Sequence, residues 1–299
     1  MTAARDPRVV LVTGCSSGFG RAMVPAFLER GWHVVATLRR ASERGPALSE
    51  ECERYSERLL IASLDVTRDD ERRAAIAAAC ERWGRLDCLV SNAGAALWGA
   101  LEDVTPAQLR AQIDVNFLGA ALLVRDALPL LRAARGRIIL ISSMFGRAGF
   151  PLSSAYCASK FALEGFAAAL GGELAMHGVQ LAIVEPGRHR TGFVRRAEWG
   201  EGSRSACSAY TEQSEAFERL SRSLAASPGP PASRVAVAVV DLAERRRMPA
   251  RLRVGLDARL AYLMRRCLPE RLADALWSAF CARALHPRPS HRAPTEVTS

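Results

Sequence analysis

The amino acid that this sequence nearly lacks is lysine. Of its 41 Lys and Arg side chains, Lys160 is the single lysine and the other 40 are arginines. Arginine can replace lysine at most surface positions, but its wide planar guanidinium is no substitute for a compact ammonium. A lysine kept in so arginine-rich a chain suggests a site that needs a point charge. Chance survival is the alternative, and the surrounding residues must decide between the two.

Other absences exclude whole classes of protein. The eight cysteines, at positions 15, 52, 80, 88, 157, 207, 267 and 281, form no C-x-x-C pair, which argues against a zinc site and a disulfide framework. We expect no metal, and free buried thiols in a reducing cytoplasm. The first residues lack the apolar run of an export signal, and no run of 18 apolar residues predicts a membrane-spanning helix.

Aromatic residues are also few, at 6% of the chain, although the net charge is +10. A nucleic-acid-binding face combines clustered basic residues with stacking aromatics. Here 12 arginines against 6 acids place +6 of the charge in residues 241–299, and the aromatics are dispersed. We therefore expect no nucleic-acid partner. Peripheral contact of the C-terminal helices with an anionic lipid surface stays an alternative.

Apolar runs that end in turn residues predict buried parallel strands. They cover 8–13, 33–38, 59–66, 86–91, 137–142, 179–187 and 251–255. Helical patterns alternate with them, including a long helix over 106–132 and another over 156–177. This order predicts an α/β fold: a doubly wound parallel sheet of about seven strands in three α/β/α layers, the Rossmann arrangement.

The first two strands end in residues suited to a dinucleotide. TGCSSGFG, with Gly14, Gly18 and Gly20, joins a strand to a helix and so offers backbone N–H groups to a diphosphate. The second strand ends in Arg39-Arg40 with no acid. An acid at this place favours NAD, whereas an arginine accommodates the 2′-phosphate of NADP. We expect NADP(H) ahead of NAD(H), with solvent-exposed surface charge as the alternative reading of these arginines.

Further polar residues follow the other strands. They are Asp65, Asn92, Ser143 and the pair Pro186-Gly187. Ligands of doubly wound sheets bind outside the carboxyl ends of the strands, where all these residues should meet. Asn116 lies among apolar neighbours in the long helix, where a buried amide must find hydrogen-bond partners.

The second half of the chain is less regular. Residues 191–231 are rich in Gly, Ser and charge, with one helix expected near 209–226, and we interpret them as a lid within a single domain of residues 1–255. Two amphipathic helices are expected over 256–285, with apolar faces that contain Leu260 and Leu276. The tail, 286–299, has the composition of a disordered segment.

Tyr156 and Lys160 stand four residues apart on a predicted helix and so share one face. A cation beside a phenol favours the phenolate, and hydride chemistry at a carbonyl needs a proton donor or acceptor. Ser143 could hydrogen-bond the substrate oxygen. These residues predict an oxidoreductase whose cofactor carries the hydride.

Together the motifs resemble the short-chain dehydrogenase/reductase family over about residues 8–192. The strings that carry the resemblance are TGCSSGFG, the NAG at 92–94, Asn116, Ser143, Tyr156-x-x-x-Lys160, and a Pro-Gly followed by Thr191. TGCSSGFG, ATLR and YCASKFALEG are similar to the branch that contains 17β-hydroxysteroid dehydrogenase type 1 and the photoreceptor retinol dehydrogenases.

The resemblance implies a role for each matched residue. Tyr156 is the general acid/base, Lys160 lowers its pKa and binds the nicotinamide ribose, Ser143 orients the substrate oxygen, and Asn116 holds a relay water. The implied cofactor-binding residues are Gly14, Ser16, Ser17, Gly18, Phe19, Gly20, Arg39, Asp65, Val66, Asn92, Ala93, Gly94, Tyr156, Lys160, Pro186, Gly187 and Thr191. The resemblance also implies a homodimer or homotetramer.

Three functions stay open at this point. The first is NADP(H)-dependent interconversion of a bulky apolar ketone or aldehyde and its alcohol, of steroid or retinoid type. The second is reduction of 3-oxoacyl or other small or carrier-bound carbonyls, because clustered basic charge could dock an acidic carrier. The third is a non-catalytic dinucleotide-binding regulator, because a fold does not determine function.

Overall fold

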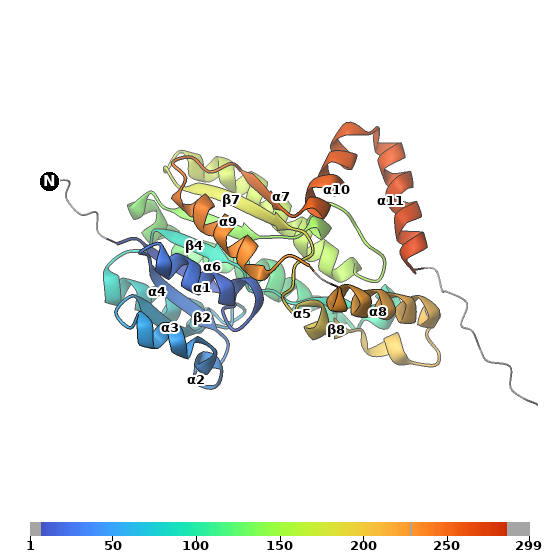
Figure 1. Cartoon of the computed structure of the whole chain (residues 1–299), viewed down its shortest axis with the longest axis horizontal. Helices are drawn as coiled ribbons and strands as arrows, with labels where there is room; N and C mark the ends of the chain where they lie inside the picture. Colours follow the sequence, from blue (N-terminus) through green and yellow to red (C-terminus); the bar gives the residue numbers. More distant parts are fainter. Residues whose placement is uncertain (1–6, 228, 286–299) are drawn as a thin grey trace, which may run out of the picture.

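The centre of the molecule is a seven-stranded parallel sheet (Figure 1), in a computed structural model that describes residues 7–227 and 229–285. Its strand order is β3-β2-β1-β4-β6-β7-β9, and every neighbouring pair is parallel. The strands are β1 (Val9–Thr13), β2 (His33–Leu38), β3 (Leu59–Ser63), β4 (Cys88–Ser91), β6 (Arg137–Ile141), β7 (Gln180–Pro186) and β9 (Arg251–Val254). The predicted fold class is confirmed.

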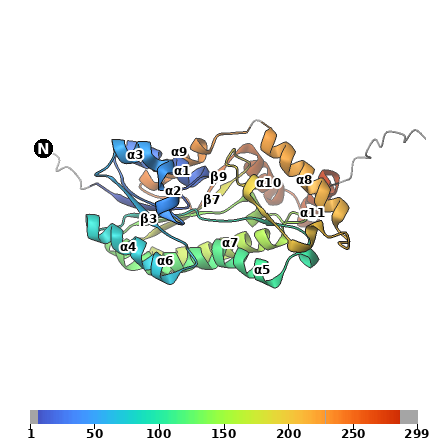
Figure 2. The ribbon, with the colours of Figure 1, turned by 90° about the horizontal axis from the view of Figure 1, so that it is seen from below.

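Helices cover both faces of this sheet (Figure 2). On one face lie α1 (Gly18–Glu29), α3 (Ser49–Arg54) and α9 (Ala232–Glu244), and on the other lie α4 (Asp69–Trp83), α5 (Pro106–Ile113), α6 (Gly119–Ala134) and α7 (Ser154–Ala175). A short α2 (Ala41–Arg44) precedes α3. Each face has its own apolar core, and β1 is buried along its whole length between the two. Burial on both faces explains why the strands are continuous apolar runs rather than alternating ones.

The long helix predicted over 106–132 is wrong in one respect, because a π-helical turn interrupts it. The turn covers Asp114–Leu118, between α5 and α6. The start of α5 is well defined: Thr105 and Gln108 form a reciprocal capping box, and Pro106 occupies the first helical position. The π turn contains Asn116, which packs toward the neighbouring loop rather than continuing the regular helix.

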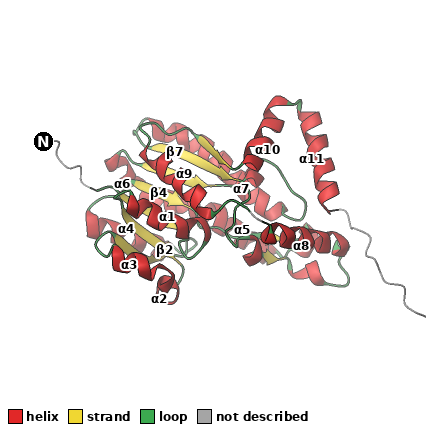
Figure 3. Cartoon of the chain, viewed as in Figure 1, coloured by secondary structure: helices red, strands yellow, loops and turns green. Residues whose placement is uncertain are grey.

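The lid contains more structure than the sequence predicted. The helix α8 (Thr211–Ala226) is confirmed, and short 3-10 turns precede it. A two-stranded sheet of β5 (Leu97–Trp98) and β8 (Glu198–Trp199) joins the lid to the loop after β4, and the sequence analysis missed both strands. Figure 3 shows this lid beside the end of the main sheet, with connecting loops between its helices.

The chain then forms α10 (Leu256–Cys267) and α11 (Glu270–Leu285), which confirms the two helices predicted there. Their apolar rows are exposed, with Leu260 at 64% and Leu276 at 47%. None of the helices in 7–227 and 229–285 combines the length and hydropathy required to cross a bilayer. All eight cysteines are free thiols, but those at 80, 207 and 267 are exposed, contrary to the expectation that all are buried. The tail predicted to be disordered lies outside the described residues.

Candidate active site

The turn between β1 and α1 is shaped for the close approach of a ligand. Gly14 and Gly18 have φ values of +73° and +60°, which favour glycine. A Cβ on Gly20 would lie 2.2 Å from the carbonyl oxygen of Gly14, so a side chain has no room there. The N-cap residue Ser17 makes no side-chain cap bond, and no acid lies in the first turn. The predicted segment from Ser16 through Phe19 therefore leaves a helix N-terminus open to a phosphate.

Thr13, which the sequence analysis missed, fastens the ends of β1 and β4 together. Its hydroxyl accepts hydrogen bonds from the backbone N–H groups of Asn92 and Ala93, both at 2.8 Å. Asn92 Nδ2 donates to the Thr13 carbonyl at 2.7 Å, and a Cβ on Gly20 would lie 2.8 Å from that nitrogen. Asn92 therefore supports the glycine turn. Its predicted contact with a ribose stays a prediction.

Asn116 connects the loop after β4 with α7. Its Oδ1 accepts from Ala95 N at 2.8 Å, and its Nδ2 donates to Ala95 O at 2.9 Å and to Ser159 Oγ at 3.0 Å. These bonds satisfy an amide that is only 1% exposed. Gly94 packs beside it, where a Cβ would lie 3.2 Å from Asn116 Oδ1 and 3.8 Å from Lys160 Nζ. The amide and the ammonium therefore border the same small space. The role of Asn116 in holding a relay water stays a prediction.

Ser143, Tyr156 and Lys160 meet at the carboxyl end of β6. Ser143 follows that strand, and its hydroxyl, which accepts from Phe145 N at 3.2 Å, lies near enough to the phenol of Tyr156 on α7 to lower the pKa of that phenol. Lys160, one turn further along α7, places Nζ 5.9 Å from the centre of the Tyr156 ring and donates to the carbonyl of Ile141 at 3.0 Å. Tyr156 and Lys160 are each 5% exposed. Three of the four predicted catalytic side chains therefore lie together, with Tyr156 and Lys160 buried and Ser143 half-buried.

Burial controls the protonation of this group. It raises the pKa of the Tyr156 phenol to about 12, and the hydrogen bond from Ser143 acts in the opposite direction. Burial also lowers the pKa of Lys160 to about 8, while the nearby carboxylate of Glu164 raises it. At neutral pH the phenol therefore holds its proton and the lysine is mostly charged. The lowering of the Tyr156 pKa by Lys160 stays a prediction.

Aromatic rings surround the Tyr156 phenol. The ring of Trp98, on β5, lies edge-on at 5.4 Å between centres, and Phe193 and Phe145 lie at 5.8 and 6.3 Å. Phe217, on α8, packs on Trp98 at 5.5 Å. The wall continues with Phe150, Leu152, Trp199, Trp277, Cys281 and Leu285. The lid and α11 thus form a continuous apolar enclosure over the phenol.

Polar bonds hold the lid to α5 and to the turn before it. Gln108 Nε2 donates to Glu198 Oε1 at 2.8 Å and to the Trp199 carbonyl at 3.0 Å. Ser208 Oγ donates to Asp103 Oδ2 at 2.9 Å. Because these bonds cross between segments about 90 or more residues apart, the lid is positioned by the main body and not only by its own sequence.

At the far end of the site, Arg39 and Arg40 border a hollow of about 210 Å³ at the end of β2. Arg68, Asp65 and Glu71 complete its lining. The acids have partners within the protein: Glu71 Oε2 accepts from Asp65 N at 2.6 Å, and Glu71 Oε1 pairs with Arg68 at 2.9 Å. Arg39 is exposed and directly follows the end of β2, as the sequence predicts.

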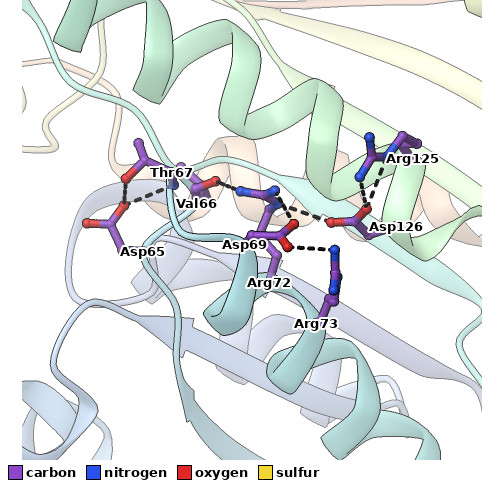
Figure 4. Close-up of polar contacts among 8 residues, drawn as sticks. All are labelled: Asp65, Val66, Thr67, Asp69, Arg72, Arg73, Arg125 and Asp126. Atoms are coloured by element: carbon purple, nitrogen blue, oxygen red, sulfur yellow. Dashed lines mark hydrogen bonds and ion pairs between the residues drawn. The ribbon is translucent and has the colours of Figure 1, made fainter.

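The segment that carries Asp65 and Val66 is rigidly held (Figure 4). Asp65 Oδ1 accepts from the N–H and the hydroxyl of Thr67, at 3.0 and 2.7 Å. Arg72, only 2% exposed, donates to the Val66 carbonyl at 2.9 Å and to Asp126 Oδ2 at 3.1 Å. The predicted adenine contacts therefore lie on a segment fixed by a buried arginine.

The loop after β7 closes the site on its other side. Arg188 N, next to Pro186–Gly187, donates to Asp257 Oδ2 at 2.6 Å. Thr191 then packs on Gly18, whose Cβ would lie 3.3 Å from Thr191 Cβ. The sequence analysis missed Asp257 because it opens α10, far along the chain from this loop.

Comparison with known proteins agrees with this arrangement. The model of the short chain dehydrogenase family matches residues 8–201. The chain belongs to the short-chain dehydrogenase family. It is therefore an oxidoreductase, as predicted.

Individual members share its sequence and its fold. Estradiol 17-beta-dehydrogenase 1 of Rattus norvegicus is 40% identical over 205 residues, which cover 66% of this chain and 58% of that one. 3-ketodihydrosphingosine reductase of Bacteroides thetaiotaomicron is 37% identical over 189 residues, 63% of this chain and 66% of that one. In both cases the match spans less than two thirds of the relative. A short-chain dehydrogenase structure from Streptomyces avermitilis is 33% identical, with a TM-score of 0.76 and coverage of 92% and 97%.

These similarities confirm the predicted family and its hydroxysteroid dehydrogenase-like branch. Within this short-chain dehydrogenase, the matched segment ends in the lid, so α8 to α11 lie beyond the family model. The enclosure over Tyr156 is thus built in part from residues after 201, which the family model does not cover.

Proposed function

We propose that this protein interconverts a bulky apolar ketone or aldehyde and the corresponding alcohol, with NADP(H) as cofactor and Tyr156 as general acid/base. One observation carries the proposal: a neutral, buried phenol lies beside the Ser143 hydroxyl, stands one helical turn from the single lysine and is walled by aromatic rings. No second function has an observation of this weight in its favour.

The residues at the strand ends fit a nicotinamide dinucleotide, which supplies or accepts the hydride when bound. The open N-terminus of α1 and the absent Cβ of Gly20 form a cradle for the diphosphate. Asp65 and Val66 would contact the adenine, and Asn92–Gly94 would lie along the sugar. Pro186–Gly187 and Thr191 would line the nicotinamide end.

NADP(H) is favoured over NAD(H) by the hollow at the end of β2. A 2′-phosphate there would meet Arg39, and Arg40 borders the same hollow. A guanidinium can bind phosphate through two parallel hydrogen bonds. The acids in the lining are engaged with Arg68 and with the backbone, so the hollow offers the phosphate mainly positive charge.

The chain's own residues can move the proton. In reduction, Tyr156 donates its phenolic proton to the substrate oxygen while Ser143 hydrogen-bonds that oxygen and fixes its position. Lys160 binds the ribose and stabilises the phenolate that forms. Asn116 holds a water through which the proton is replaced. In oxidation the same groups act in reverse, with Tyr156 as the base.

The substrate class follows from the enclosure. Trp98, Phe193 and Phe217 provide a wide apolar surface beside the phenol, which suits a large apolar carbonyl compound and burial of its surface. The panel that tests this should pair estradiol, retinol and 3-ketodihydrosphingosine with a carrier-linked 3-oxoacyl chain, each with both cofactors. Highest kcat/KM on the carrier-linked chain would favour the alternative substrate class.

Tyr156→Phe tests the mechanism. We expect turnover to fall by about 10³-fold or more while NADPH still binds, because only the proton donor is lost. Tyr55→Phe, at the end of α3 and far from the site, is the matched control and should keep wild-type rates. Near-normal turnover in Tyr156→Phe contradicts the assignment. If the wild-type protein fails to oxidise NADPH with every carbonyl compound of the panel, the non-catalytic regulator is favoured instead.

Arg39→Ala tests the cofactor. We expect the KM for NADPH to rise at least tenfold and that for NADH to change little, because only NADPH carries the phosphate. Arg54→Ala, also exposed but outside the hollow, serves as the control. Higher kcat/KM with NADH than with NADPH in the wild type contradicts the preference. The homodimer or homotetramer also stays a prediction, which sedimentation of the purified chain can test.

A further inference from the structure

Behind Lys160 lies a cluster of buried charges to which the proposed function gives no role. Glu164 on α7 is 4% exposed and Glu185 on β7 is 2% exposed. Carboxylates are seldom buried unless cations or hydrogen bonds compensate them. Two of them this close to the site therefore need an explanation.

The sequence builds the cluster from two periodicities. Tyr156, Lys160 and Glu164 stand at i, i+4 and i+8 of one helix and so form a single stripe along α7. On the sheet, Glu185 pairs in register with Arg253 of β9, and Arg251 lies two residues earlier on the same face. The stripe on the helix and the arginines on the edge strand meet at Glu164.

Arg251 joins the two carboxylates. Its Nε donates to Glu164 Oε2 at 3.3 Å and lies 3.5 Å from Glu185 Oε1. Arg253 Nε lies 2.8 Å from Glu185 Oε2, which gives Glu185 a second cation. Glu164 has one ion pair with an arginine among the described residues, and its Oε1 has no hydrogen-bond partner there. Glu164 is thus the less compensated of the two.

Glu164 also faces the catalytic loop. Gly146, three residues after Ser143, packs on it so closely that a Cβ there would lie 3.1 Å from Glu164 Cγ. The charged and polar groups that face the carboxyl are Ser142 at the end of β6, Arg147 in the following loop, Glu185 on β7, Arg251 on β9 and Lys160 on its own helix. Of the cations in this set, Lys160 is the one that shares the helix with Glu164, one turn away along α7.

We propose that Glu164 is a positioning residue for Lys160: its carboxylate, held by Arg251, keeps the buried ammonium charged and in place beneath Tyr156. The effect of Glu164 on the pKa of Lys160, which it raises, agrees with this role. Burial and Glu185 raise the pKa of Glu164 itself, and Arg251 and Arg147 oppose that rise and so favour the carboxylate. The inference rests on the proposed function for its catalytic meaning, but the electrostatic coupling can be measured without turnover.

The single lysine makes this measurement direct. Protein grown with ¹³Cε-lysine gives one lysine resonance, that of Lys160, and its chemical shift can be followed from pH 6 to 11. We expect a midpoint near pH 8 in the wild type. Glu164→Gln should lower it by about one pH unit, a tenfold loss of proton affinity, because an attractive charge is removed. Glu164→Asp should restore most of the difference, and Glu173→Gln, exposed on the same helix, should leave the midpoint unchanged.

An unchanged Lys160 midpoint in Glu164→Gln overturns the inference whatever the activity. If Glu164→Gln does not fold, Glu164→Met, which also removes the charge, decides: the inference holds if its Lys160 midpoint falls below that of the wild type and fails if the midpoint stays at the wild-type value. The alkaline limb of kcat/KM for ketone reduction should move with the NMR midpoint. Coupling without any carbonyl reduction by the wild type would refute the proposed function and leave the coupling intact.

Discussion

Replacing Lys160 by methionine should change how stability depends on pH. The folded protein lowers the pKa of this lysine to about 8, whereas its ordinary value is 10.5. Below pH 8 the lysine is charged in both states, and the fold carries the whole cost of burying that charge. Between pH 8 and 10.5 Lys160 is mostly neutral in the folded state and still mostly charged in the unfolded state, so the cost of burying its charge declines. Above 10.5 it is gone. Methionine has a similar length and carries none of this cost.

The size of the effect follows from the two pKa values. The difference between them means that the buried charge of Lys160 destabilises the fold by about 3 kcal/mol at pH 7 and by about 1.4 kcal/mol at pH 9.5. The free energy of unfolding of Lys160→Met relative to wild type should therefore fall by about 2 kcal/mol between these pH values. Loss of the hydrogen bond to Ile141 O costs the variant about 1–3 kcal/mol at every pH. It offsets the curve without changing its slope.

Urea unfolding followed by tryptophan fluorescence at pH 7.0, 8.0, 8.75 and 9.5 measures this difference. Buried thiols such as Cys15, whose pKa is raised to about 12, also make stability pH-dependent, but they act equally in both proteins and cancel. Tyr156→Phe is the control: its phenol has a folded pKa of about 12 and an ordinary one of 10, so its difference from wild type should stay flat up to pH 9.5. Parallel wild-type and Lys160→Met curves would refute the reasoning.

Three more outcomes test the structure around the site. Arg72→Leu should lower the free energy of unfolding by about 3 kcal/mol in urea, because it leaves the carboxylate of Asp126 with only the exposed Arg125 as its partner, whereas Arg73→Leu, whose ion pair is exposed, should cost about 1 kcal/mol or less. Gly20→Ala should abolish NADPH binding by calorimetry, because its Cβ would overlap the Gly14 carbonyl; Gly172→Ala, exposed in α7 with open space around it, should bind normally. Alcohol oxidation should gain about tenfold in kcat/KM per pH unit from about pH 6 to 7.5, because Tyr156 must lose its proton while Lys160 is still charged; a plateau below pH 7 would contradict the phenol pKa of about 12.

The sequence predicted the fold and the location of the site because both depend on local patterns. Each buried strand is an apolar run, and the residue that follows it is fixed at one edge of the sheet by topology alone. Strand order and helical spacing alone therefore predict that Ser143, Tyr156 and Lys160 lie together. Their contact in the structure follows from the same two periodicities.

Features that depend on distant partners were beyond such reasoning. The pairing of β5 with β8 joins two-residue strands about 100 residues apart, too short for any alternation to appear. Asp257 supports the loop at Arg188 only because α10 begins beside the end of β7. The π turn at Asn116 is stabilised by bonds to Ala95, which no helical propensity contains. In each case the tertiary partner decides the local structure.

The structure also supplies the reason that lysine survives at position 160. Arg72 shows what a buried arginine requires here: Nε donates to Asp126, Nη1 to the Val66 carbonyl and Nη2 to Asp69. Among residues 7–227 and 229–285, Lys160 has one hydrogen-bond acceptor, the carbonyl of Ile141. A guanidinium in that space would leave most of its five donors unpaired, and it could not lose its charge to relieve the burial. A chain that uses arginine for its other 40 cations therefore keeps lysine at the position that offers one acceptor to a buried charge.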